Sequence, residues 1–396
     1  MAGSKPRMLI LNGSHSDIPL IEAAKSLGFY VITTGNLPHL PGHRHGDEYC
    51  YGDFSHKEEM LALASRLGID AVCSCANDFG IITASYLAEK LGLPGHDPYE
   101  TTLTLHHKDR FRALLTQHGL NTIPAQGFSH EQEALTFAKQ LNYPQLVKPI
   151  DLTGGKGITK VENEREYATA VQRAFSLSQE KRIVVEEFIQ GTLHSLHTFI
   201  RDGKVIFHFS DNEFSFQNPF LVSTSAAPAL GFSLVKESLI SLAEQMTHIL
   251  SLQDGILHGQ YLMRQGKAYL LEYTRRCSGD FYTWPVQYAT GVDTAYWMVK
   301  VAAGMGCADF PHTTQQHFCG RHCLMASRNG TIANVHVAPE LAGNVYKAYW
   351  MWQKGQLVDN YLHQKMGILF LRYDSMDEMM DKTQRIHQLA QVELEP

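Results

Sequence analysis

The sequence has 396 residues, more than one hydrophobic core usually serves, so we expect two or three packed lobes. Hydrophobic residues make up 44% of the chain and charged residues 19%, and the formal net charge is −6. This balance excludes a disordered chain and does not suit a protein that coats an acidic polymer, so we expect no nucleic-acid partner.

The apolar runs of the chain are short. None approaches the roughly 20 apolar residues that a membrane helix needs, which predicts no membrane partner and a cytoplasmic location. The seven cysteines make an odd and sparse set in a chain of this length. Disulfide-rich secreted proteins are shorter and denser in cysteine, so we expect reduced thiols. The sequence is compatible with a homodimer but does not decide the oligomeric state.

Short apolar strands alternate with helical segments over about the first hundred residues. Strands are predicted at Met8–Asn12, Phe29–Thr33 and Ala71–Ser74, and helices at Ile18–Leu27, Lys57–Leu67 and Ile81–Leu91. This alternation predicts an α/β domain with a doubly wound parallel sheet. Ligands bind at the carboxyl ends of such strands, here Gly13-Ser14 and Asn77-Asp78. The dinucleotide fingerprint is missing after the first strand, so an NAD site is not favoured.

A glycine-rich loop joins two predicted strands further along the chain. Helices at Lys108–His118 and Glu131–Leu141 precede the strand Gln145–Pro149, the loop at 151–157 follows it, and Ile158–Val161 is again a strand. A Walker P-loop would lead into a helix instead. Lys148 ends the first strand, where a buried ammonium needs an anion, so a phosphate is its expected partner. The loop could cradle an anion through its backbone, or be only a flexible hairpin tip.

Two adjacent carboxylates lie in the next predicted strand. After a helix at Glu164–Ser176, the run Ile183–Ile189 contains Glu186 and Glu187. Side chains alternate along a strand, so at least one carboxylate faces inward and needs a donor. An adenine amino group or a ribose hydroxyl would serve. His194 could contact the same sugar or be structural.

Most segments from His194 to Glu272 alternate as antiparallel strands would, and the last of them form a β-hairpin. With Gly266 at the centre of its turn, Gln260 lies opposite Glu272, and His258 lies opposite Thr274. These side chains share one face, which Arg276 continues. Such a cluster suits a metal-bound polyphosphate, and the alternative is a solvated sheet face. From about Phe310 we expect short strands, a turn at Asn329-Gly330 and a final helix near 376–391.

The order of these features resembles the ATP-grasp superfamily. It is most similar to the carboxylate-amine ligase branch, which includes biotin carboxylase, the carbamoyl phosphate synthetase large chain and L-amino-acid ligases. The likeness implies a pre-ATP-grasp α/β domain at residues 1–107. A two-lobed ATP-grasp α+β module would follow, with a small lobe at 108–190 that carries the glycine loop. The large lobe and a C-terminal extension would fill 191–396.

The resemblance also implies roles for individual residues, with ATP and Mg²⁺ as cofactors. Lys108 and Lys148 would hold phosphates, and the loop of Gly154, Gly155, Lys156 and Gly157 would close over them. Glu186 and the backbone of Glu187, Phe188 and Ile189 would hold adenine, and Glu187 or His194 would hold ribose. Arg276, with Lys148, would act on the reacting carboxylate or acyl phosphate. Ser278, Gly279 and Asp280 would line the acceptor pocket.

The sequence departs from the family at the metal shell. Two carboxylates and an asparagine of the family fall here on Glu272, Gln260 and Thr274, so only Glu272 keeps its charge. Mg²⁺ prefers charged oxygen ligands, so we expect weak metal binding to the free protein. Two functions stay open. One is an ATP-dependent ligase that joins a small carboxylate, such as an amino acid, to an amine through an acyl phosphate. The other is a degenerate nucleotide-binding or regulatory protein.

Overall fold

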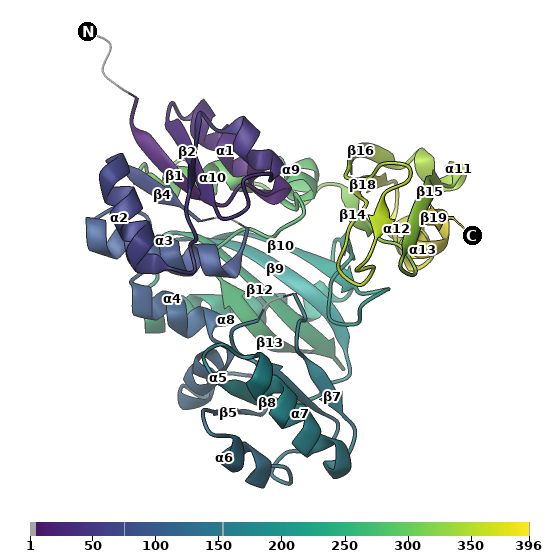
Figure 1. The fold of residues 1–396 in the computed structure, drawn as a ribbon. Coiled ribbons are helices and arrows are strands. Elements are labelled where there is room, and N and C mark those ends of the chain that lie inside the picture. The colour runs from purple at the N-terminus through teal and green to yellow at the C-terminus, as the bar shows by residue number, and fades with distance from the viewer. Residues whose placement is uncertain (1–4, 75, 153, 396) are drawn as a thin grey trace.

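The computed structural model describes residues 5–74, 76–152 and 154–395, and these form three bodies around a large central sheet (Figure 1). The N-terminal domain and the C-terminal segment flank one end of this sheet, and a small lobe lies at the other. None of the helices in the described part of the chain combines the length and apolar character that a bilayer crossing requires. The six described cysteines are free thiols, as expected, and Cys75 lies outside the described residues.

The N-terminal domain is the predicted parallel α/β domain. Its sheet has the order β3-β2-β1-β4, with every neighbouring pair parallel. The strands are β1 (Arg7–Leu11), β2 (Tyr30–Gly35), β3 (Glu48–Tyr51) and β4 (Ala71–Cys73). The helices are α1 (Ile18–Ser26), α2 (Lys57–Leu67) and α3 (Asp78–Leu91), with 3-10 turns at His15–Asp17 and Pro41–His45. Asn77 caps α3 by accepting from Phe79 N at 2.9 Å, so α3 begins at the carboxyl edge of the sheet.

The small lobe is an antiparallel sheet with the order β5-β8-β6-β7. Its strands are β5 (Ala125–Phe128), β6 (Gln145–Pro149), β7 (Thr159–Val161) and β8 (Ile183–Glu187). The helices of this region are α4 (Tyr99–His106), α5 (Lys108–Gln117), α6 (Glu131–Thr136) and α7 (Glu164–Leu177). The glycine loop joins β6 to β7 and is therefore a hairpin connection, as the sequence pattern predicts. The helix expected at Glu131–Leu141 ends earlier, at Thr136.

The central sheet has eight strands in the order β13-β12-β9-β10-β11-β14-β18-β16. Its first strands are β9 (Thr192–Arg201), β10 (Lys204–Phe214), β11 (Thr224–Ala227), β12 (Gly255–Arg264) and β13 (Lys267–Thr274). The expectation of strands through this region misses one long helix, α8 (Phe232–Leu250). The buried residues of α8 recur with helical spacing at Val235, Leu239, Leu242 and Met246. This spacing is the signal that would have revealed the helix.

The C-terminal segment extends the same sheet. After α9 (Thr283–Thr290) and α10 (Thr294–Ala302), it adds β14 (Phe318–Leu324), β16 (Val345–Trp350) and β18 (Gly367–Tyr373). A second sheet, β17-β15-β19, contains β15 (Gly330–Val337), β17 (Leu357–Val358) and β19 (Ala390–Leu394). The helices here are α11 (Pro339–Ala342), α12 (Met376–Gln384) and α13 (Ile386–Leu389). The final helix expected near 376–391 is thus found as two shorter helices, and only its last two residues belong instead to β19.

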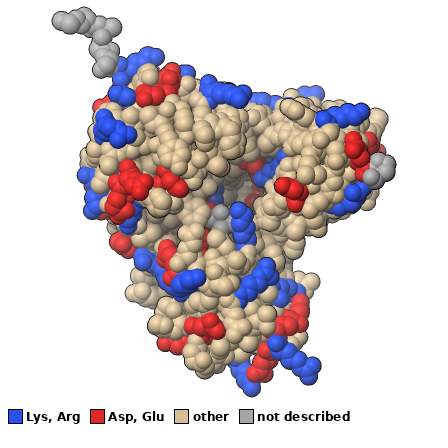
Figure 2. All heavy atoms as spheres, in the orientation of Figure 1, with Lys and Arg blue, Asp and Glu red and all other residues tan. Residues whose placement is uncertain are grey.

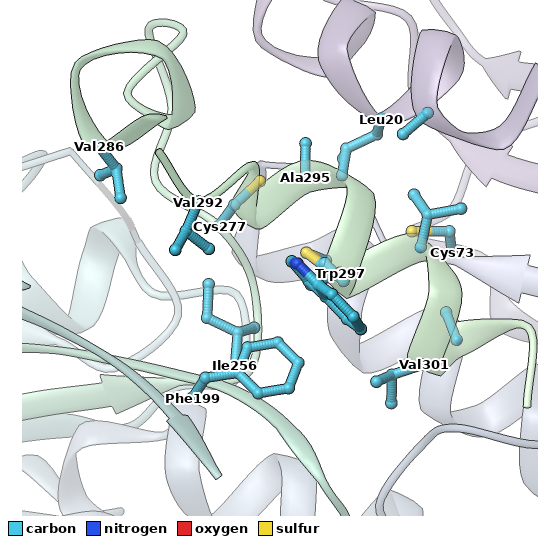
Figure 3. Close-up of a cluster of buried hydrophobic side chains, with 14 of the residues drawn as sticks. Leu20, Cys73, Phe199, Ile256, Cys277, Val286, Val292, Ala295, Trp297 and Val301 are labelled. Carbon is cyan, nitrogen blue, oxygen red and sulfur yellow. The ribbon is translucent and has the colours of Figure 1, made fainter. Parts of the chain in front are cut away.

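A buried apolar cluster joins the N-terminal domain to the central sheet (Figure 3). It includes Leu20 of α1, Cys73 of β4, Trp297 of α10 and Phe199 of β9. Helices α1 and α10 pack against each other beside it. Because close-packed interiors resist sliding, this shared core fixes the carboxyl edge of the parallel sheet beside the central sheet.

Candidate active site

A cavity of about 950 Å³ lies where the small lobe, the central sheet and the N-terminal domain meet. Figure 2 shows this face of the molecule hollowed between the three bodies, with both basic and acidic side chains around the hollow. Most of the site residues expected from the sequence line the cavity: Lys108, Lys148, Gly154, Gly155, Glu186, Glu187, Phe188, Ile189, His194, Gln260, Glu272, Arg276, Ser278, Gly279 and Asp280. Lys156, Gly157 and Thr274 are not among its lining residues.

Lys148 and Glu186 form a buried ion pair in the wall of this cavity. The Lys148 ammonium donates to Oε2 of Glu186, and Nε of Arg112 donates to Oε1 at 2.9 Å. Nη1 of Arg112 also donates to the Leu270 carbonyl oxygen at 3.1 Å, which ties α5 to the hairpin. Burial opposes ionisation of Glu186, but Arg112 and Lys148 outweigh it and lower the pKa of Glu186 to about 2.

This pairing changes the roles expected for the two residues. The anion that meets the buried ammonium of Lys148 is supplied by the chain itself. Both carboxylate oxygens of Glu186 face internal cations, so Glu186 is poorly placed to accept from an adenine amino group. Its carboxylate instead fixes Lys148 at the cavity wall, where the ammonium retains further donors for a phosphate.

The glycine loop reaches across the cavity to the central sheet's side. Gly154, Gly155 and Gly157 have φ of +63°, +74° and +75°, a region that favours glycine. A β-carbon on Gly155 would collide with the backbone and side chain of Phe220. Nζ of Lys108 donates to the Leu152 carbonyl oxygen at 3.3 Å, which holds the start of the loop. Lys156 is exposed on the outer side, and Thr153 lies outside the described residues.

The segment after β8 forms the wall where adenine and ribose are expected. Oε1 of Glu187 accepts from N and Nδ2 of Asn142 at 2.9 and 2.8 Å, and Lys160 lies over the Phe188 ring at 4.3 Å. The His194 ring nitrogens contact the Asp211 carbonyl oxygen and Thr192 Oγ1 at 3.2 and 2.7 Å. Burial lowers the pKa of His194 to about 4, so its imidazole is neutral.

The hairpin of β12 and β13 has the predicted pairs. Gln260 lies opposite Glu272, and His258 lies opposite Thr274. Oγ1 of Thr274 contacts His106 Nε2 at 3.2 Å and borders a second cavity of about 310 Å³, which Glu272 also lines. Thr274 is therefore turned away from the larger cavity. Within the described residues, the Glu272 carboxylate has no hydrogen bond or ion pair, so it is free to accept a ligand.

Arg276 is held by the N-terminal domain. Its Nε donates to Oδ1 of Asp78 at 2.7 Å, and Asp78 is the first residue of α3. His106 Nδ1 lies 3.4 Å from the same oxygen. Burial opposes ionisation of Asp78, but Arg276 and His106 outweigh it and keep its pKa well below the usual range. The carboxyl edge of the N-terminal parallel sheet, where a ligand was expected to bind, thus holds Arg276 in place. Arg276 is the residue expected to bind the substrate.

Asp280 is surrounded by basic side chains that the sequence pattern does not connect with the site. Its carboxylate pairs with Lys365 at 2.6 Å, Arg321 at 3.1 Å and His15 at 3.4 Å. Burial opposes ionisation, but these groups hold the pKa of Asp280 well below its usual range. Beside it, Oγ of Ser278 contacts His258 Nε2 at 3.1 Å. The turn at 278–280 is thus fixed by groups from three separate regions.

Two acidic residues of β10 were missed by the sequence analysis. Asp211 accepts from Ser195 and from the hydroxyl of Tyr282, and burial raises its pKa to about 7. Oε2 of Glu213 accepts from Nε2 of Gln260 at 2.7 Å, and Glu213 lines the cavity. Burial, reinforced by Asp211, raises the pKa of Glu213 well above its usual range. The polar run Ser-Asp-Asn-Glu inside an otherwise apolar strand was the available signal.

The family model for the ATP binding domain of the carbamoyl-phosphate synthase L chain matches residues 107–309, just over half of the chain. The chain belongs to this family. The matched part contains the glycine loop, the Lys148–Glu186 pair and the hairpin, and the family is of the ATP-grasp type that the order of motifs resembles.

One curated relative is the C-terminal section of the carbamoyl phosphate synthase large chain from Aquifex aeolicus. It is 27% identical over 200 residues, which cover 50% of this chain and 37% of that protein. The chain therefore spans well under half the length of this relative.

Two solved ATP-grasp structures share the fold over nearly the whole chain. The L-amino acid ligase from Bacillus licheniformis has a TM-score of 0.81 at 18% identity, with both chains covered completely. The biotin carboxylase domain of 2-oxoglutarate carboxylase from Hydrogenobacter thermophilus, in complex with MgADP, ADP and bicarbonate, has a TM-score of 0.78 at 19% identity. That alignment covers 99% of this chain and 91% of the domain. The two-lobed ATP-grasp architecture is thereby confirmed.

The donor atoms around the hairpin fit the magnesium that this family implies. Glu272 offers an unpaired carboxylate, and Gln260 offers an amide oxygen on the same face. Both are hard oxygen donors, which is the ligand type that Mg²⁺ prefers. They line the same cavity as Lys108 and Lys148, so a metal held there would adjoin bound phosphates.

Proposed function

We propose that this protein is an ATP-dependent ligase that joins a small carboxylate to an amine through an acyl phosphate. One observation carries the proposal: a single cavity brings together the fixed ammonium of Lys148, the glycine loop, the free carboxylate of Glu272 and the guanidinium of Arg276. Membership of an ATP-binding family supports the nucleotide. The likeness in fold to an L-amino acid ligase supports an amino acid as one candidate substrate.

ATP would lie between the small lobe and the central sheet. Lys108, Lys148 and the backbone of the glycine loop would hold its phosphates. The backbone of 187–189 would read the adenine edge, because the Glu186 carboxylate is already paired. Glu272 and Gln260 would hold Mg²⁺, whose positive charge would offset the negative charge of the phosphates.

The first step would form the acyl phosphate. A carboxylate oxygen of the substrate, oriented by Arg276, attacks the γ-phosphorus, and the bond to the β,γ-bridging oxygen breaks. ADP leaves with that electron pair. The ammonium of Lys148 is fixed by Glu186 before the nucleotide arrives, so it stabilises the developing negative charge with little reorganisation.

The second step would form the C–N bond. The nitrogen lone pair of the amine attacks the acyl carbon, the bond from this carbon to the phosphate oxygen breaks, and inorganic phosphate leaves while the nitrogen releases a proton to water. The turn of Ser278, Gly279 and Asp280 lies beside Arg276 in the cavity wall, and we assign the acceptor to this end. We expect small-molecule partners for both steps.

A degenerate nucleotide-binding protein is the second candidate. The neutral side chains of Gln260 and Thr274 at the metal shell favour it, and so does the commitment of Thr274 to His106. Such a protein would bind ATP or ADP without turning ATP over in the presence of any carboxylate and amine.

The test is ADP release in the presence of ATP, Mg²⁺ and pairs of amino acids, hydroxy acids and amines, with the product identified by mass. We expect ADP formation that depends on both a carboxylate and an amine, and that is abolished in Glu272→Gln and Arg276→Ala. Nucleotide binding without turnover for every pair would favour the degenerate protein. No binding at millimolar ATP or ADP with Mg²⁺ would refute both.

A further inference from the structure

The hairpin has lost a carboxylate at Gln260, but a carboxylate from another strand lies against that position. Glu213 is near the end of β10 and lines the same cavity as Gln260 and Glu272. Its Oε2 accepts from Nε2 of Gln260 at 2.7 Å. The carboxyl group missing from β12 is thus supplied by β10, within hydrogen-bond reach of Gln260.

The strand register places these groups on one face of the central sheet. Asp211 faces Ser195, Ser195 faces Gln260, and Gln260 faces Glu272, so a single row crosses β10, β9, β12 and β13. Glu213 is two residues beyond Asp211 on β10, and side chains two residues apart share a face. Glu213 therefore approaches Gln260 diagonally, from the next row of the same face.

The contact also fixes how the Gln260 amide is turned. Its Nε2 donates to Glu213, so Oε1, the other arm of the planar amide, is directed away from that contact. Among the side chains of Glu213, Gln260 and Glu272, three acceptors then have no hydrogen bond or ion pair to the described residues: Oε1 of Glu213, Oε1 of Gln260 and the Glu272 carboxylate. All three residues line one cavity.

We propose that Glu213 supplies the second carboxylate of the metal site that accompanies ATP and holds the carbonyl oxygen of Gln260 toward the metal. The inference rests on the proposed function for the nucleotide. It gives Mg²⁺ two carboxylates and one amide oxygen, drawn from β10 and from the hairpin, without the Thr274 hydroxyl. The site would then keep two carboxylates, with one of them moved from β12 to β10; we call this arrangement the relocated shell.

The test measures Mn²⁺ binding to the protein–ADP complex by electron paramagnetic resonance, which needs no turnover. We expect Glu213→Gln to weaken Mn²⁺ binding at least about 10- to 100-fold, the loss typical when a group that orients a metal ligand is removed. ADP binding in the presence of EDTA should change less than about twofold, because Glu213 faces the metal rather than the nucleotide. Glu237→Gln, the same change on the exposed side of α8, is the control and should leave both affinities unchanged.

A charge swap separates a metal role from a merely structural one. In Glu213→Gln combined with Gln260→Glu, the amide and the carboxylate exchange strands and keep their contact. We expect Mn²⁺ affinity to return to near that of the unaltered protein. The inference is overturned if Glu213→Gln binds Mn²⁺ normally in the ADP complex.

The swap also provides the test if Glu213→Gln alone fails to fold. Mn²⁺ binding by the swapped protein supports the relocated shell, and its loss with intact ADP binding overturns it. Absence of ADP binding in the unaltered protein would instead refute the proposed nucleotide function, so the two failures are distinguishable.

Discussion

Lys148 is positioned before any nucleotide arrives, because Glu186 holds its ammonium in the cavity wall. A charged hydrogen bond from this ammonium to a phosphate of ADP would contribute about 1.5–3 kcal/mol. We therefore expect Lys148→Ala to weaken ADP binding about 10- to 100-fold by isothermal titration. Lys156→Ala is the matched control, since Lys156 is exposed outside the cavity, and it should change the affinity less than about twofold. Comparable losses in both variants would contradict this role for Lys148.

Glu186 should make stability depend on pH. Its pKa is about 2 in the folded protein and 4.5 ordinarily, so its contribution is complete above about pH 4.5 and is lost as the pH falls toward 2. Glu186→Gln leaves Arg112 and Lys148 buried without their carboxylate, which costs about 3–5 kcal/mol at pH 7. In denaturant unfolding, the difference between the two proteins should shrink below about pH 4.5.

The neighbouring carboxylate provides the control for this measurement. Among the residues that the structure describes, the Glu187 carboxylate accepts from Asn142 alone, so Glu187→Gln should destabilise by about 1 kcal/mol at most. A stability difference for Glu186→Gln that stays constant from pH 7 to pH 3 would show that its charge is not what stabilises the fold.

The sequence predicted that Lys148 needs an anion but not which one. Lys148 faces Val184 across the antiparallel pair of β6 and β8, which brings Glu186, two residues further, onto the same face. That register cannot be read from either strand alone. Arg112 was hidden for another reason: it lies on a charged amphipathic helix, where an arginine is ordinarily solvated, yet it is 3% exposed.

At the scale of elements, the pairing of Gln260 with Glu272 was predicted correctly, although the turn was expected to be centred on Gly266 and is centred between Gln265 and Gly266. Gln265 and Gly266 form the turn, both with positive φ, so pairs near it are shifted by one residue. An irregularity between Gln260 and Tyr261 restores the predicted pairing of Gln260 with Glu272. A bulge leaves little trace in the hydrophobic pattern, so sequence periodicity does not reveal it.

The end of the chain shows why local pattern fails where partners are distant. Residues 390–394 form β19 by pairing with β15, whose strand ends at Val337. Local spacing after Met376 favours a continuing helix, and only the open edge of β15 makes an extended conformation better. The missed α8 has a different origin, because its helical spacing is present in the sequence.

The glycine loop should act through its contact with Phe220. Gly155 and Gly154 both have positive φ, but only at Gly155 would a β-carbon collide with Phe220; the nearest atom at Gly154 is 3.9 Å away. Both alanine variants should therefore carry similar backbone strain, about 1 kcal/mol. We expect Gly155→Ala to weaken ADP binding at least fivefold more than Gly154→Ala, measured by titration. Equal effects would mean that loop strain, not closure against Phe220, sets the affinity.

At the scale of the whole molecule, the site exists because three bodies meet. The parallel sheet presents Asp78 at its carboxyl edge, as the sequence predicts for ligand binding at that edge. In the structure, however, Asp78 pairs with the side chain of Arg276, which lies 198 residues later in the sequence. A sequence motif can indicate that each of the two residues belongs to a site. Their proximity depends on the folded structure, in which the core shared by α1 and α10 brings them together.

The Asp78–Arg276 pair should therefore couple the N-terminal domain to the central sheet. The two side chains are 25% and 14% exposed, so their interaction is only partly screened. In a double-mutant cycle of Asp78→Asn and Arg276→Gln at pH 7, where Asp78 is ionised, we expect a coupling energy of about 1–3 kcal/mol in the free energy of unfolding. The exposed pair Lys139–Glu164, whose side chains are 77% and 58% exposed, should give less than about 1 kcal/mol in the matching cycle. The coupling should disappear as the pH falls through the depressed pKa of Asp78, because protonation removes the charge that Arg276 faces. Strictly additive effects at pH 7 would mean that the apolar core alone joins the domains and that Arg276 is not held from the N-terminal side.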